Sequence, residues 1–175
     1  MRTPTDVLRD EHRIILEALD VLDAAAERLA RGGALPDGWW PELIEWLRAY
    51  ADRNHHAKEE RSLFPKMVKA GVPSEGGPVG VMLEEHTQGR ALVQAMATGA
   101  PAERPDVARR YTRLLRDHIE KENGVLFPLA DAVLDEAAQA TLRGEFQGVA
   151  DELGREASPD WAQATLDRLM AALAA

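Results

Sequence analysis

One eleven-residue pattern occurs twice in the chain, and its residues are of types that bind metal ions. The copies begin at His55 and His118 and share His, Lys, Glu, Leu, Phe and Pro at six of eleven aligned positions. In each copy a Glu follows the His by four residues; these are Glu59 and Glu122. Residues four apart lie on one face of an α-helix, so each copy presents an imidazole and a carboxylate to the same point. Two such helices facing each other would surround a pair of metal ions.

Two further histidines lie on apolar helix faces. His12 stands in a seam of apolar residues spaced alternately four and three apart, and His86 occupies a core-facing position in a helix predicted from about 78 to 98. Each of four predicted helices therefore contributes one histidine to the core. Burying four imidazoles and two carboxylates without partners would be costly, and a bound metal satisfies them best. The alternative is a hydrogen-bonded polar network.

The types of donor restrict the metal. The chain has no cysteine, so thiolate sites, Cys-ligated iron–sulfur clusters and disulfides are excluded. Imidazole with carboxylate suits iron, and also manganese or zinc. Two carboxylates shared between two ions suit a dinuclear centre of the kind that helical bundles hold. The order of the residues, with His first and Glu four later, differs from the Glu-x-x-His motif of ferritin-like proteins.

Helix start and stop signals divide the chain into helices, and no strand pattern appears. Four inward-facing helices with short loops imply an all-α, up-down-up-down four-helix bundle over about 5–135. A C-terminal helical extension, about 136–175, is expected to pack outside it within a single domain, 1–175. We expect Asp37 to cap the second helix, and Pro65 to kink or end it.

Composition excludes several classes of protein. The 175 residues carry Lys+Arg 21 against Asp+Glu 30, a net charge of −9, which argues against nucleic-acid binding. No apolar run approaches the roughly 20 residues of a membrane span, and the N-terminus does not resemble a signal peptide. We expect a cytoplasmic protein that binds neither nucleic acid nor membranes.

The sequence resembles the hemerythrin-like family, also called the HHE cation-binding domain. The resemblance covers most of residues 5–135 and is carried by His-His-Ala-Lys-Glu-Glu with its trailing Leu-Phe-Pro. It implies a four-helix bundle around a non-haem di-iron centre. By motif match, the resemblance implies four terminal histidine ligands: His12, His55, His86 and His118. It also implies that Glu59 and Glu122 bridge the two irons.

The chain departs from the respiratory hemerythrins in two places. Met82 stands where they carry a fifth histidine, and Glu122 stands where they carry an aspartate. Two octahedral irons offer about twelve positions. The implied ligands fill eight and an oxo or hydroxo bridge fills two, which leaves two open. His56 is the first candidate for one of these, and Tyr50 and Tyr111 are minor candidates. The alternative for His56 is a hydrogen bond beside the ligands.

The residues around the centre have expected roles of their own. Lys58 and Lys121 are expected to lie off the ligand face and to reach solvent. Glu60 and Glu85 are expected beside the ligands or in solvent. Four apolar residues of the repeated pattern are expected to wall the site and exclude water: Leu63, Phe64, Leu126 and Phe127.

These features favour a protein that binds O2 or a related small oxidant, peroxide or nitric oxide, at a centre of two iron ions. Manganese or zinc are the alternative metals. An iron or redox sensor and a metal-storage or scaffold protein are the alternative functions, and enzymatic activity is left open. The expected partner is a small diatomic or peroxide ligand; the oligomeric state is open, with a homodimer as one option.

Overall fold

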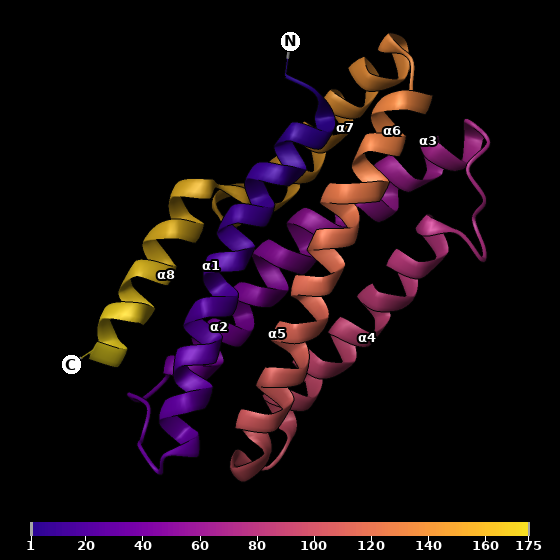
Figure 1. Cartoon of the computed structure of the whole chain (residues 1–175). Helices are drawn as coiled ribbons and strands as arrows, with labels where there is room; N and C mark the ends of the chain where they lie inside the picture. The colour runs from indigo at the N-terminus through magenta and orange to yellow at the C-terminus, as the bar shows by residue number, and fades with distance from the viewer. Residues whose placement is uncertain (1, 175) are drawn as a thin grey trace.

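The structure is a computed structural model that describes residues 2–174, and all regular structure in this range is helical (Figure 1). The prediction of an all-α protein is therefore confirmed for these residues. The helices, in which η marks π-helical or 3₁₀ segments, are α1 Pro4–Ala30, α2 Trp39–Trp46, η1 Leu47–His56, η2 Glu59–Leu63, α3 Phe64–Lys69, α4 Pro78–Thr98, η3 Pro101–Glu103, α5 Arg104–Lys121, η4 Glu122–Leu126, α6 Phe127–Val133, α7 Glu136–Leu153, η5 Gly154–Ala157 and α8 Pro159–Ala174.

Long helical rods lie side by side in the molecule (Figure 1). The path α2–η1–η2–α3 forms one rod and α5–η4–α6 another, while α1 and α4 are single helices. Helix α5 contacts both α1 and α4, and η1 contacts the same two helices. Helix α8 packs on α1 and α2, and α7 packs on η1 and η2. Among the described residues, none of the helices combines the length and apolarity that a bilayer span requires.

Local signals set the starts of the first two helices. Thr3 caps α1, because its hydroxyl accepts from the Asp6 backbone N–H while its own N–H donates to the Asp6 carboxylate at 2.9 Å. The prediction that Asp37 caps the second helix is wrong. Gly38, with φ 76°, is the residue before α2, and the Trp39 N–H closes a turn onto the carbonyl of Pro36. The helix therefore begins after a turn that needs the left-handed backbone conformation of Gly38, and no side chain caps it.

Of the two outcomes predicted for Pro65, the one in which it ends its helix is wrong, and the one in which it kinks the helix stays a prediction. The π-helical segment η2 ends at Leu63, and α3 continues through Pro65 in its first turn. The second copy repeats this, since η4 ends at Leu126 and Pro128 lies in the first turn of α6. A widened turn removes the close approach of the proline ring to the carbonyl one turn earlier, and it leaves no hydrogen bond for proline to break.

The core consists of two apolar clusters along the rods with a polar layer between them. One cluster gathers Trp40, Trp46 and Tyr50 with parts of α1 and α5. The other gathers Met67 and Phe146 with the ends of the rods near α7. Along each rod the histidines and glutamates of the predicted site fall between these clusters. The fold therefore buries a layer of polar groups between two apolar clusters.

Candidate metal centre

The structure brings the predicted site residues together from four rods. Helix α1 supplies one histidine, the η1–η2 path supplies two histidines and a glutamate, α4 supplies one histidine, and α5 with η4 supplies a histidine and a glutamate. All are buried, and six of them expose no more than 1% of their surface: His12, His55, Glu59, His86, His118 and Glu122.

Donor atoms converge at two points. At the first, Nε2 of His12 lies 3.1 Å from Oε2 of Glu122. Nε2 of His55 lies 3.5 Å from Oε1 of Glu59 at the same point. Each of these four residues can offer one ligand atom such that all four atoms lie within 4.8 Å of one another. The first point is therefore a four-residue group that could hold one metal ion.

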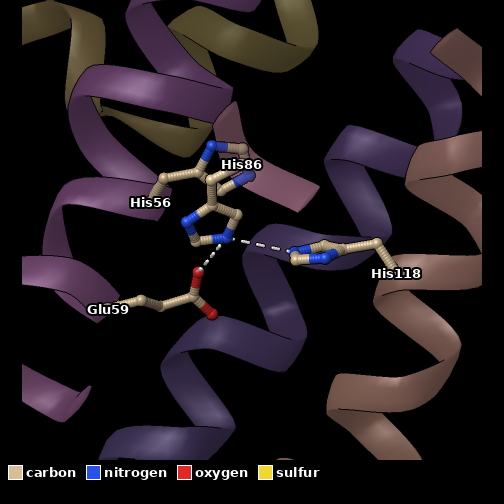
Figure 2. A group of neighbouring side chains, drawn as sticks. All are labelled: His56, Glu59, His86 and His118. Atoms are coloured by element: carbon tan, nitrogen blue, oxygen red, sulfur yellow. Dashed lines mark hydrogen bonds and ion pairs between the residues drawn. The ribbon is translucent and has the colours of Figure 1, made fainter. Parts of the chain in front are cut away.

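The second point lies on the other side of the same two glutamates. Nε2 of His86 is 3.3 Å from Oε2 of Glu59 and 3.1 Å from Nε2 of His118 (Figure 2). Nε2 of His118 is 3.3 Å from Oε1 of Glu122. Each glutamate thus turns one oxygen toward each point, so Glu59 and Glu122 are placed as bridges between two groups.

These distances fit the spacing of ligands around a metal ion. First-row metals bind imidazole nitrogen at about 2.1 Å, so two donors at right angles about one ion lie about 3.0 Å apart. The contacts between donors at both points run from 3.1 to 3.5 Å. The donors are therefore set as neighbouring ligands would be.

The polar atoms at the two points lack other partners. Nε2 of His12 and His55 and all four carboxylate oxygens of Glu59 and Glu122 are buried without a hydrogen bond. Leaving a buried polar group unsatisfied costs about 1–3 kcal/mol, and more for a charged group. A cation at each point would satisfy these atoms together.

The other ring nitrogen of each of these histidines is held by an oxygen. A carboxylate or amide oxygen can only accept, so each Nδ1 carries a proton, and in the neutral form of each ring Nε2 presents a lone pair to the centre. The pairs and their distances are His12 with Asn123 Oδ1 at 2.9 Å, His55 with Glu11 Oε2 at 3.0 Å, His86 with Glu60 Oε1 at 2.7 Å, and His118 with Glu85 Oε2 at 2.9 Å.

Comparison with known proteins identifies the family of the chain. Residues 3–130 match the family described as the hemerythrin HHE cation binding domain. The chain belongs to this family. The predicted resemblance is thereby confirmed.

The hemerythrin domain also has named relatives. The chain is similar to proteins called "Iron-sulfur cluster repair protein YtfE" from Escherichia coli O139:H28 and Shigella boydii serotype 18, at 31% identity over 137 residues in each case. That alignment covers 69% of this chain and 60% of each relative, so the chain spans about three fifths of their length. No solved structure matches it.

His56 lies at the second point of the hemerythrin domain. It can join Glu59, His86 and His118 as a donor within 4.8 Å of the others, and its ring stacks on His86 with centroids 3.9 Å apart (Figure 2). Its Nδ1 is 3.4 Å from Oδ1 of Asp52 but makes no hydrogen bond. In η1 the wider π turn reduces the angle between successive side chains, so His55 and His56 can face two adjacent points.

A buried pair that the sequence did not reveal supports the first point. Glu11 accepts from His55, from the Asn54 amide at 3.0 Å and from the Lys58 ammonium. The expectation that Lys58 reaches solvent is wrong, because it is 3% exposed and points at Glu11. The signal was present: Lys58 is one turn beyond Asn54, on the face turned to α1. Lys121, by contrast, is partly exposed and pairs with Glu85.

The electrostatics of the site favour charged carboxylates. Burial alone would raise the pKa of Glu122, but the fields of His118 and His12 outweigh it and hold that pKa well below its usual value. Burial likewise opposes ionisation of Glu11, and its bonds to His55 and Lys58 lower its pKa. Burial, together with the charge of His86, holds the pKa of His56 well below normal. His56 is therefore neutral, as a metal ligand must be.

Aromatic rings close the site, as expected for the Leu-Phe-Pro residues. Phe127 stacks on His12 with centroids 5.3 Å apart, and Phe64 stacks on His86 at 5.9 Å. Leu63 and Leu126 are buried next to them. Each copy of the repeated motif therefore places a buried carboxylate and, five residues later, an aromatic ring at the site.

Proposed function

We propose that the chain holds two iron ions, one at each point, and uses them to bind a small oxidant. His12 and His55 would hold the first ion, and His56, His86 and His118 the second. Glu59 and Glu122 would bridge the two. The observation that carries this proposal is that each glutamate directs its two orphaned oxygens to different histidine groups.

The donor chemistry allows iron, and the name of the relatives favours it over manganese and zinc. Imidazole and carboxylate without thiolate suit iron, manganese and zinc, and membership of a cation-binding family agrees with all three. The relatives' printed name connects them to iron–sulfur clusters. Iron is therefore the metal we propose, with manganese and zinc as the alternatives.

The chain's own residues prepare the site for an exogenous ligand. Bound iron would supply redox chemistry and an open coordination position. The oxygens on each Nδ1 fix the ring orientation of the histidines, and Phe64 and Phe127 keep bulk water from the donors. With His56 as a ligand, one position stays free for O2, peroxide or nitric oxide.

The relatives favour a second candidate, a contribution to iron–sulfur cluster repair. The 175 residues contain no cysteine, so they cannot hold a cluster through thiolates of their own. In such a role this chain would release iron to an acceptor or remove an oxidant that damages clusters. An iron sensor or an iron store uses the same site without oxidant chemistry.

The arrangement of the helices serves this site. We propose that α1, α2–α3, α4 and α5–α6 form an up-down-up-down bundle around the two ions. In this proposal α7 and α8 pack outside the bundle and complete a single domain.

One experiment separates these candidates. The protein is stripped of metal, loaded with ferrous iron without air, and then exposed to O2 or nitric oxide while visible absorption is followed. A charge-transfer band that vanishes when the gas is removed supports reversible binding. Permanent oxidation without an adduct contradicts oxygen carriage. Rapid transfer of iron to an apo acceptor protein, with no adduct, supports the repair candidate.

A further inference from the structure

One surface pocket reaches the side of the centre that His56 occupies. It has a volume of about 360 Å³ and lies between η1 and α4, with Tyr111 of α5 at its inner wall. Four other surface pockets within residues 2–174 contain none of the candidate ligands. The pocket therefore connects solvent with His56, one of the donors at the second point.

Gly89 gives this pocket its room. It is buried in the interior of α4, where glycine costs about 1 kcal/mol relative to alanine. Its φ is not positive, and a Cβ built on it would meet only Tyr111 Cε2, at an ordinary 3.8 Å. Neither backbone conformation nor close packing requires glycine at this position. What the missing side chain leaves is open volume beside His56.

The charges on the rim are already paired. Arg90 donates to Asp52 and to Glu60, both at 2.7 Å. Glu45 compensates the other two guanidinium groups of the pocket: Arg53 donates to it at 2.7 Å, and Arg48 lies 3.9 Å from it. A pocket with no uncompensated guanidinium has no particular attraction for anions. Its walls include the apolar side chains of Leu47, Ala51 and Val93.

We propose that this pocket is the entry and docking site for a small neutral oxidant, and that Gly89 keeps it open to the His56 edge of the centre. The inference rests on the proposed function, because an oxidant needs the iron that the centre would hold. The volume lies at the lower end of the range for small-molecule sites, so the pocket can hold a neutral molecule before it reaches the metal.

The first test compares Gly89→Leu with Gly148→Leu, both loaded with ferrous iron. Gly148 is an exposed glycine of α7 with open space around its Cβ position, so leucine fits there without touching the pocket. Nitric oxide is mixed rapidly with each protein. We expect Gly89→Leu to lower the second-order rate constant about tenfold while the final spectrum and iron content match the wild type. Equal rate constants in both variants would overturn the proposal.

The second test does not depend on the metal. Crystals of each protein are pressurised with xenon, which occupies apolar cavities. We expect a xenon peak in the pocket of the wild type and of Gly148→Leu, and none in Gly89→Leu. A wild-type pocket without xenon, or a peak that persists in Gly89→Leu, would contradict the inference. If leucine disturbs folding, Gly89→Ala, which fits sterically, replaces Gly89→Leu in the first test. Its second-order rate constant for nitric oxide should lie below that of the wild type.

The two arms separate the two proposals. Suppose that nitric oxide binds to none of the proteins, while xenon enters the pocket of the wild type and is absent from that of Gly89→Leu. The proposed function then fails and the pocket stands. If nitric oxide binds all variants at one rate, the centre stands and the entry route fails.

Discussion

His86 and His118 direct their Nε2 atoms at each other across 3.1 Å, although each ring is held through its Nδ1 by a glutamate. With both Nδ1 atoms protonated, two lone pairs face each other in a buried site. This arrangement is repulsive unless a proton or a metal ion lies between the rings. The pair therefore requires a proton in the metal-free protein, at a place where a metal ion could take over the same role.

Replacing a bridging glutamate should remove the dinuclear site. In Glu59→Gln or Glu122→Gln one oxygen of each pair becomes an amide nitrogen, which cannot ligate a metal, so we expect no more than one iron per chain. Elemental analysis after anaerobic loading measures this. Glu120→Gln, at an exposed position next to the motif, is the control and should retain the wild-type content. Two irons in either bridge variant would contradict the assignment.

Glu11→Gln should weaken metal binding and lower stability together. The change removes the carboxylate that holds His55 and leaves Lys58 as a buried charge without its partner. Loss of a group that orients a metal ligand typically costs about 10–100-fold in affinity. Breaking a buried ion pair costs about 3–5 kcal/mol of unfolding free energy. Iron titration and denaturant unfolding measure the two effects.

A double variant separates these two effects. In Glu11→Gln with Lys58→Met the buried charge is gone, so most of the stability should return. The affinity for iron should stay low, because the anionic partner of His55 is still missing. Recovery of both properties would show that Glu11 acts on folding alone.

His56→Leu tests the ligand that the sequence left open. If His56 binds the second ion, leucine should weaken the second site by about 10–100-fold and leave the first site unchanged. Stepwise titration with ferrous iron resolves the two sites. Asp52→Asn is the matched control, since it lies beside His56 but contributes no atom to either group. Identical titrations for His56→Leu and the wild type would show that His56 only packs on His86.

The stability of the metal-free protein should fall as the pH rises. Burial lowers the pKa of His86, but Glu59 and Glu60 outweigh burial and raise it from 6.5 to about 9. A group with a raised pKa in the folded state stabilises that state fully below pH 6.5, and this contribution is lost as the pH rises through 9. The Tm of chelator-treated protein should therefore decrease between these values.

The stabilisation that bound iron adds should rise with pH, opposite to the trend of the metal-free protein. Protons compete with the metal for the same nitrogens, so the increase in Tm on adding iron should grow with pH over this range. His86→Gln should flatten the pH dependence of the metal-free protein. A metal-free Tm that rises from pH 6.5 to 9 would argue against the charge arrangement at His86.

The spacing of residues along the chain predicted which side chains meet. His55 and His118 with their glutamates were found because residues four apart share a helix face, and His12 and His86 because each interrupts an apolar seam. That these residues bind metal stays a prediction. The helical class followed from the same periodicity, and the structure confirms it.

What the sequence did not reveal depends on contacts between distant elements or on turn geometry. Glu11 meets Lys58 from another helix, 47 positions away, and lysine is seldom buried without such a partner. The π turns at Glu59 and Glu122 have the same apolar pattern as an α-helix. The trailing prolines were their only signal, and we interpreted Pro65 as a kink or an end of the helix.

The most direct measurement of the central claim is a crystal structure of the iron-loaded protein with anomalous diffraction recorded on both sides of the iron absorption edge. The account predicts two iron peaks per chain. One would lie among His12, His55 and the two glutamates, and the other among His56, His86, His118 and the same glutamates. A single peak, or peaks that the carboxylates of Glu59 and Glu122 do not join, would contradict it.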